Sequence, residues 1–278
     1  MSSPRKKSYD WCIFCGDANG QRTDEHSVPK ALGGGLVLDG ELVLKNATCS
    51  VCQEITFKVE SRIMLEAFHG VDQHLPLPVP KKEKLRPVSY FKGNQEVTEN
   101  FPKDDHFTVH AMPVLPRAGF MVNRGRPDTD FDFNGEWYYW SWQKDTEERA
   151  GRIALDFLIE RKYSAQDLAK FFTKIAHCYA VYRLGFNFRP LARELLLGRS
   201  HQFAHLVGCH RRVIGNDSLH YLSLETVQYE GVTFYIVYVW LFCPADPTEE
   251  VPVFEVVVGH ENTDKFAKKS NWSKRKPV

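Results

Sequence analysis

The chain has 278 residues, 43% of them hydrophobic and 26% charged, and its 36 basic residues nearly balance its 35 acidic ones to leave a net charge of +1. These values suit a globular protein of about two domains and exclude a strongly basic or predominantly disordered chain, so any basic surface for a nucleic acid has to be local. No segment reaches the roughly 18 uninterrupted apolar residues of a membrane span and none resembles a signal peptide, which predicts a cytoplasmic protein that makes no membrane contact.

Residues 8–70 form the first predicted domain. Residues 36–44 alternate around Asp39-Gly40, a favoured two-residue turn, and predict a short hairpin. Over residues 50–68, apolar residues recur at nearly helical spacing, which predicts one amphipathic helix. Its expected buried positions are Val51, Ile55, Val59, Ile63 and Phe68.

The composition changes at residues 71–87, where alternating prolines are followed by clustered lysines, and we expect an extended linker there. Residues 88–262 predict a second, mixed α+β domain of unrecognised fold, which is expected to serve targeting, regulation or oligomerisation. Ser164 and Asp167 are spaced as a helix capping box. Residues 263–278 form a basic tail, and a homo-oligomer stays open. The expected strands are 106–122, 131–142, 219–228, 232–242 and 251–258, and the expected helices are 146–162, 164–182 and 189–197.

Two CxxC pairs, Cys12 with Cys15 and Cys49 with Cys52, flank the polar segment of the first domain. A CxxC turn places two thiolates on a tight knuckle, and two knuckles complete a tetrahedral set of ligands. A closed site of four cysteines is typical of structural zinc. The pattern predicts bound zinc but does not by itself indicate a function.

The segment between the two pairs contains TDEHSVPKALGG at residues 23–34 and KNATC at residues 45–49. Together with the flanking cysteines, this order of motifs resembles the HNH endonuclease family, in particular bacterial members with the pattern CxxCG, DEHxxPKALGG and NAtCxxCN. The resemblance covers about residues 12–64. It implies a ββα-metal fold for the first domain, so that the fold class expected for the whole chain is α+β.

The resemblance also assigns roles to four residues. His26 matches the general base of the family, and Glu25 matches a ligand of a catalytic divalent cation, Mg²⁺ or another. Asn46 matches the asparagine that orients the histidine through a hydrogen bond. Gln53 stands at the position of the second metal ligand, where the family has asparagine or histidine, and this departure leaves open whether the catalytic metal binds.

These residue types suit phosphodiester hydrolysis. A histidine that titrates near neutrality can take a proton from water, and a hard cation held by carboxylate and amide oxygens can stabilise the charge on the phosphate. We therefore expect an endonuclease that acts on DNA, with Lys30 and Lys45 contacting phosphates, and a role in bacterial defence. The alternative is a zinc-stabilised module that binds nucleic acid or a protein without cleaving it.

A third hypothesis concerns the sequence HQFAHLVGCH of the second domain, which contains His201, His205, Cys209 and His210. Histidines four residues apart on a helix can bind zinc, but the glutamate that accompanies them in zinc proteases is missing. The aromatic residues of 137–142 offer a surface on which bases could stack. Packing inside the protein is the competing interpretation of both features.

Overall fold

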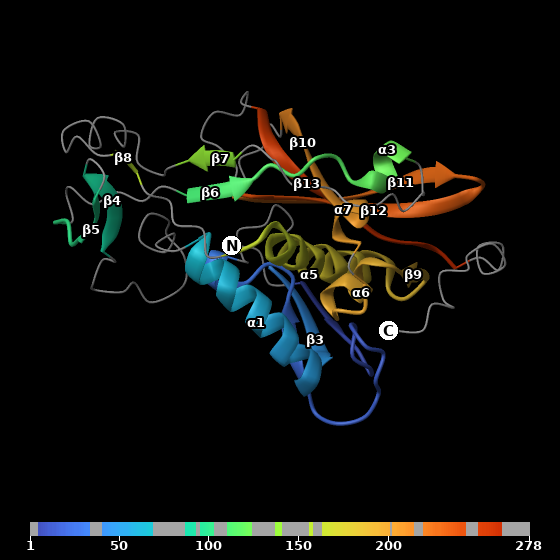
Figure 1. The fold of residues 1–278 in the computed structure, drawn as a ribbon. Coiled ribbons are helices and arrows are strands. Elements are labelled where there is room, and N and C mark those ends of the chain that lie inside the picture. Colours follow the sequence, from blue (N-terminus) through green and yellow to red (C-terminus); the bar gives the residue numbers. More distant parts are fainter. Residues whose placement is uncertain are drawn as a thin grey trace.

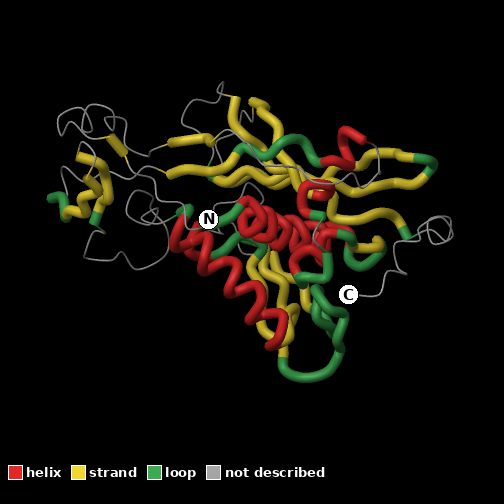
Figure 2. Tube along the Cα trace, viewed as in Figure 1, coloured by secondary structure: helices red, strands yellow, loops and turns green. Residues whose placement is uncertain are grey.

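The computed structural model describes residues 5–33, 41–68, 87–92, 95–102, 110–123, 137–140, 156–157, 163–200, 202–213, 219–242 and 250–262. These residues form helices together with several separate sheets, so the mixed α+β class is confirmed (Figures 1 and 2). Among the helices of these ranges, none combines the length and the apolar character needed to cross a bilayer. Most of the predicted linker, the turn of the predicted hairpin at 36–44 and the whole basic tail lie outside the described residues.

The N-terminal sheet consists of β1 (Arg5–Ser8), β2 (Arg22–His26) and β3 (Leu42–Cys49) in the order β1-β3-β2. Strand β1 runs parallel to β3, and β2 runs antiparallel to it. The short helix η1 (Lys30–Leu32) follows β2, and helix α1 (Ser50–Glu66) begins directly after β3.

Helix α1 confirms the helix predicted over residues 50–68. Ile63 and Phe68 are buried as expected. Val51, however, is 68% exposed, because Cys52 instead points inward from the first turn. The apolar spacing therefore predicted the helix correctly but not every position of its buried face.

The C-terminal sheet consists of β9 (Phe188–Pro190), β10 (Val207–Val213), β11 (His220–Tyr229), β12 (Val232–Leu241) and β13 (Glu250–Glu261). Its order is β10-β13-β12-β11, and β9 pairs with the C-terminal end of β13. The hairpin predicted from the sequence is confirmed, because β11 and β12 pair over their whole length around Glu230 and Gly231, both at positive φ. Gly259 in β13 lets β9 approach, since a Cβ atom there would lie 2.2 Å from the carbonyl oxygen of Arg189.

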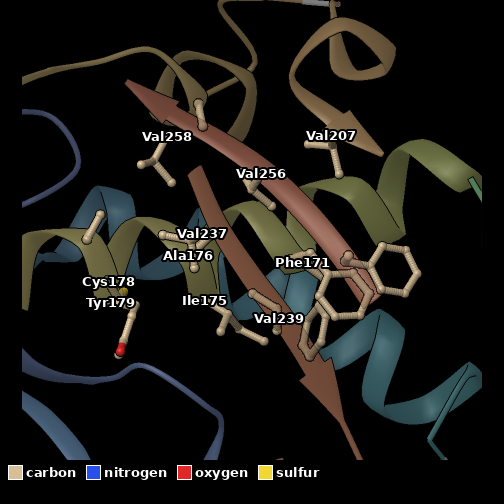
Figure 3. Packing of buried hydrophobic residues seen from close by; sticks show 14 of the residues in the cluster. Phe171, Ile175, Ala176, Cys178, Tyr179, Val207, Val237, Val239, Val256 and Val258 are labelled. Atoms are coloured by element: carbon tan, nitrogen blue, oxygen red, sulfur yellow. The ribbon is translucent and has the colours of Figure 1, made fainter. Parts of the chain in front are cut away.

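Helix α5 (Ala165–Leu184) lies between the C-terminal sheet and the N-terminal elements β3 and α1 (Figure 1). Its predicted capping box is confirmed, since Ser164 and Asp167 bond each other's backbone N–H groups. One side of α5 packs Phe171 and Ile175 against the valines of β12 and β13 (Figure 3). Residues 171–181 are buried without interruption, which is typical of a helix covered on all sides, so α5 forms a central layer.

The remaining elements correct three predictions. Residues 119–123 are a helix, not part of a strand over 106–122, and residues 156–157 are a strand, not part of a helix over 146–162. The predicted helix at 189–197 divides into β9 and a shorter helix, because β9 pairs with β13. These elements are β4 (Val88–Lys92), β5 (Gln95–Glu99), β6 (His110–Pro113), α3 (Gly119–Asn123), β7 (Trp137–Trp140), β8 (Asp156–Phe157), α6 (Ala192–Leu196) and α7 (Phe203–Leu206).

One hydrophobic core runs through both parts of the chain, from Tyr9 near the N-terminus to Val258 in β13. Polar contacts cross the same boundary: Tyr9 Oη donates to the carbonyl of Val181 at 3.3 Å, and Ser27 Oγ donates to that of Ile175 at 3.2 Å. The division into two domains stays a prediction, but the described residues of the two parts are packed together through α5.

Candidate functional site

The four cysteines of the two CxxC pairs lie together, as the sequence predicts. The Sγ atoms of Cys12, Cys15, Cys49 and Cys52 are all within 4.8 Å of one another, and those of Cys15 and Cys49 are 3.7 Å apart. Around a zinc ion with Zn–S bonds of about 2.3 Å, tetrahedral geometry sets neighbouring sulfurs about 3.8 Å apart. The four thiols can therefore hold a metal ion such as zinc.

Local backbone geometry explains how the first pair forms its knuckle. The N–H of Gly16 donates to the carbonyl of Cys12, and Gly16 has φ +82°, a conformation that glycine adopts without strain. A hydrogen bond from the Cys52 thiol, helped by backbone groups, lowers the pKa of Cys12 to about 4. The same hydrogen bond with Cys12 raises the pKa of Cys52, and burial raises that of Cys15, so of these three thiols Cys12 is the one that favours the thiolate form.

A cleft of about 500 Å³ lies between the end of β2, the segment 29–31 and one face of α1. The predicted base His26 and the two predicted ligands of the catalytic cation, Glu25 and Gln53, line it together, and so does Lys30. Lys174 of α5, which the sequence analysis did not single out, lines its inner side. The structure therefore brings most of the predicted site into one place.

His26 lies at the edge of this cleft beside a carboxylate. Its Nδ1 is 2.9 Å from Oε1 of Glu41, and the histidine side chain is 23% exposed. Burial lowers the pKa of His26 below its ordinary value, although the negative charge of Glu41 acts in the opposite direction. The contact does not have the geometry of a hydrogen bond, so Glu41 acts on the ring of His26 through its charge.

Glu25 is buried and makes contacts that differ from those of an open metal ligand. Its Oε1 lies 2.7 Å from Nζ of Lys174, and its Oε2 accepts a hydrogen bond of 2.9 Å from the hydroxyl of Thr48. Both carboxylate oxygens are thus engaged by the protein. Gln53 faces the same cleft, but the contacts of Glu25 do not fit a divalent cation that needs a free carboxylate oxygen there.

The polar residues of the site that were not predicted from the sequence include Glu41, Glu60 and Lys174. A signal for Lys174 was present, because a lysine in the middle of an otherwise apolar helix has to find a buried partner. Glu60 follows Gln53 by about two helical turns and therefore shares its face of α1. Glu41 follows the predicted Asp39-Gly40 turn, and nothing in the sequence alone directed it to His26.

Asn46 and Lys45 lie outside the lining of the cleft. Asn46 has φ +53° where the pairing of β2 with β3 shifts register, and its backbone N–H donates to Oδ1 of Asp24 at 3.2 Å. Its side-chain amide lies 3.5 Å from the hydroxyl of Ser8. Lys45 pairs with the carboxylate of Asp24. In this arrangement Asn46 shapes the strand, and its hydrogen bond to His26 stays a prediction.

The histidine-rich sequence of the second part does not gather into a metal site within the described residues, where the four-cysteine cluster is the group that can hold an ion. His205 belongs to α7, whereas Cys209 and His210 belong to β10 and point to opposite faces of that strand. His210 lies 3.4 Å from the carboxylate of Glu255. His201 falls outside the described residues, as do two residues of the aromatic run at 137–142.

Comparisons with protein-family models, with curated proteins and with solved structures find no match for this chain.

Proposed function

We propose that this protein hydrolyses phosphodiester bonds of a nucleic acid, most simply DNA, as an endonuclease with an HNH-like ββα-metal core. The observation that carries the proposal is the cleft that places His26, backed by Glu41, beside Lys30 and Gln53. The order β2, β3, α1, with a cysteine knuckle before the first strand and another at the helix start, supports the same interpretation.

In this proposal His26 is the general base. Glu41 stabilises the protonated form of the ring through its charge, so that the ring can take a proton from water as that water attacks the phosphorus atom. The P–O bond to the leaving oxygen breaks in the same step, and the leaving oxygen takes its proton from solvent. Lys30 lines the cleft with an exposed side chain and can neutralise charge on the phosphate. The step needs the neutral form of His26, and burial favours that form near neutral pH.

The four cysteines have a structural role in this proposal and hold zinc. Because they join the segment before β2 to the start of α1, a bound ion fixes the two walls of the cleft relative to each other. Zinc bound by four thiolates has no open position for substrate, so it contributes to folding rather than to the reaction.

The test is cleavage of plasmid DNA and of labelled single-stranded DNA, duplex DNA and RNA by the full chain, compared with His26→Ala. We expect cleavage by the wild type and a loss of about 10²–10⁴-fold in the variant, which is the range for a general base. Zinc content and melting temperature serve as controls for folding. Equal cleavage by the variant would contradict the role of His26.

A second candidate is binding without hydrolysis, and the engagement of Glu25 by Lys174 and Thr48 favours it. It predicts nucleic-acid binding that weakens steeply as salt rises, with no cleavage under any metal condition. Lys30→Gln should reduce that binding, whereas Glu54→Gln, on the exposed side of α1 away from the cleft lining, should not.

A further inference from the structure

Lys174 is surrounded by oxygen atoms although it lies in the middle of a buried helix. Its Nζ is 2.7 Å from Oε1 of Glu25 and 2.6 Å from Oε1 of Glu60, and its side chain is 1% exposed. It also donates to the backbone carbonyl of His26 and lies 3.4 Å from that of Ser27. Carboxylate and carbonyl oxygens of this kind are the ligands that hard cations prefer.

The charges of this group explain why an ammonium ion is stable there. Burial alone would lower the pKa of Lys174, but the attraction of Glu25 and Glu60 outweighs it and raises the pKa above its ordinary value. Burial raises the pKa of Glu60 despite the neighbouring lysine. Without the lysine, two carboxylates would share a buried space with no cation between them, which is strongly unfavourable.

We propose that the ammonium group of Lys174 occupies a cation site formed by Glu25 and Glu60 at the inner side of the cleft, in place of a divalent ion. Lys174 is then a positioning residue, since it holds the backbone of His26 and fixes Glu25 without reaching the solvent side. The consequence for hydrolysis rests on the proposed function, whereas the occupancy of the cation site does not.

This proposal explains why the N-terminal part needs α5. The pair Glu25 and Glu60 comes from β2 and α1, but the cation that joins them comes from a helix more than a hundred residues later in the chain. A movement of α5 would separate the carboxylates from their cation and shift the backbone of His26. The second part of the chain therefore completes the candidate site.

Direct binding of Mn²⁺ to the zinc-loaded full chain, followed by electron paramagnetic resonance, tests the occupancy. The wild type should show no Mn²⁺ binding that depends on Glu25. Lys174→Met should gain one Mn²⁺ site, with an affinity at least about tenfold higher than that of any Mn²⁺ binding by the wild type. Adding Glu60→Gln to Lys174→Met should abolish the new site, and adding Glu54→Gln should leave it. A folded Lys174→Met protein that gains no site would overturn the proposal.

The wild type and Glu25→Gln decide the matter if Lys174→Met does not fold. Mn²⁺ binding by the wild type that disappears in Glu25→Gln would show that a divalent ion displaces the ammonium group, and the proposal would be wrong. Equal Mn²⁺ binding by the two proteins supports it. Zinc content measured on the same samples separates this site from the four cysteines.

Cleavage assays then separate this proposal from the proposed function. In buffer without Mg²⁺ or Mn²⁺, with zinc retained in the protein, the wild type should keep its rate within about threefold, whereas Lys174→Met should lose about a hundredfold or more and recover with Mg²⁺. A merely structural lysine would not produce recovery by a metal ion. Absence of cleavage in every protein would reject the nuclease, and the Mn²⁺ result would still decide the role of Lys174.

Discussion

The N-terminal part, residues 5–33 and 41–68, and the C-terminal sheet with α5 are stabilised in different ways. The sheet and α5 bury large apolar side chains, among them Phe172, which stacks on Phe254 with ring centroids 3.8 Å apart. The N-terminal part also buries apolar side chains such as Phe14 and Phe68, but in addition it gathers four cysteines whose Sγ atoms can hold a metal ion. A small unit of this kind needs a metal ion or a neighbour to remain folded.

The difference indicates a division of tasks. The candidate metal ligands and most of the polar residues that line the cleft lie in the N-terminal part, and the shared apolar core supplies the helix α5 against which they are fixed. His177 and Lys174 of α5 illustrate this, since His177 Nε2 lies 2.8 Å from the carbonyl of Ile13 inside the first knuckle. The candidate site is therefore a product of the junction between the two parts.

Removal of the proposed zinc from the four cysteines should have the largest effect and should separate the two parts. Structural zinc sites contribute apparent binding free energies of about 10–16 kcal/mol in zinc-finger peptides. We expect Cys49→Ser or chelation to remove amide protection from β2, β3 and α1 while β12 and β13 stay protected in hydrogen-exchange mass spectrometry. Cys209→Ser, which changes a buried cysteine outside the cluster, is the matched control and should retain the metal. Unchanged protection after metal loss would contradict the comparison.

Truncation of Phe172 should destabilise the C-terminal sheet with α5. Deleting a fully buried phenylalanine leaves a cavity and costs about 3–5 kcal/mol, and Phe172→Ala also removes the stacked contact with Phe254. Phe57→Ala, at a position that is 65% exposed, should change the free energy of unfolding by less than about 0.5 kcal/mol. Urea denaturation of both variants measures the difference, and similar costs would show that the core is not centred on α5.

Local signals in the sequence predicted the elements that depend on neighbouring residues. The capping box of Ser164 and Asp167, the turn at Glu230-Gly231 and the helix after Cys49 are all confirmed. The short strand β9 was predicted as helix, because its pairing with β13 joins residues about seventy positions apart. The propensity of a short segment carries no information about such a partner.

The candidate site, like the fold, could be predicted from the sequence only where its residues are close together in the chain. Spacing alone predicted that Cys12, Cys15, Cys49 and Cys52 come together, and motif order placed Glu25, His26 and Gln53 near each other. It could not predict that Lys174 reaches Glu25, since that contact depends on how α5 packs against β2 and α1. A partner chosen by tertiary packing changes the chemistry of Glu25 without changing any residue of the motif.

The pH dependence of stability should reveal a polar link between the two parts. His220 of β11 lies 2.6 Å from the carbonyl of Leu32 through Nε2, and its Nδ1 accepts from the N–H of Phe242 at 3.3 Å, so the neutral ring is required. Burial lowers the pKa of His220 to about 4. The unfolded chain takes up the proton near pH 6.5, so this stability is complete above about pH 6.5 and is lost as the pH falls from about 6.5 to 4.

The expected loss from this one group is on the order of 3 kcal/mol, from about 1.4 kcal/mol for each unit of pKa shift. His220→Gln removes the titration, so its free energy of unfolding should depend less steeply on pH over that interval than that of the wild type. Urea denaturation at intervals between the two pH limits measures both curves. Parallel curves for the two proteins would contradict the lowered pKa of His220.

The value of kcat/KM should fall at acid pH because His26 becomes protonated. This fall, the acid limb of the pH profile, should move in opposite directions along the pH axis in two variants. Because burial lowers its pKa, the limb of kcat/KM should lie below the ordinary histidine value. The carboxylate of Glu41 favours the protonated ring, so Glu41→Gln, which keeps the size of the side chain, should move the limb to lower pH. Lys30 disfavours the protonated ring, so Lys30→Gln should move the limb to higher pH. Since Lys30→Gln also weakens phosphate contacts, its plateau rate should fall as well, and only the direction of the limb bears on the base. Shifts of the same sign would assign the limb to another group and would remove His26 from the proposed role.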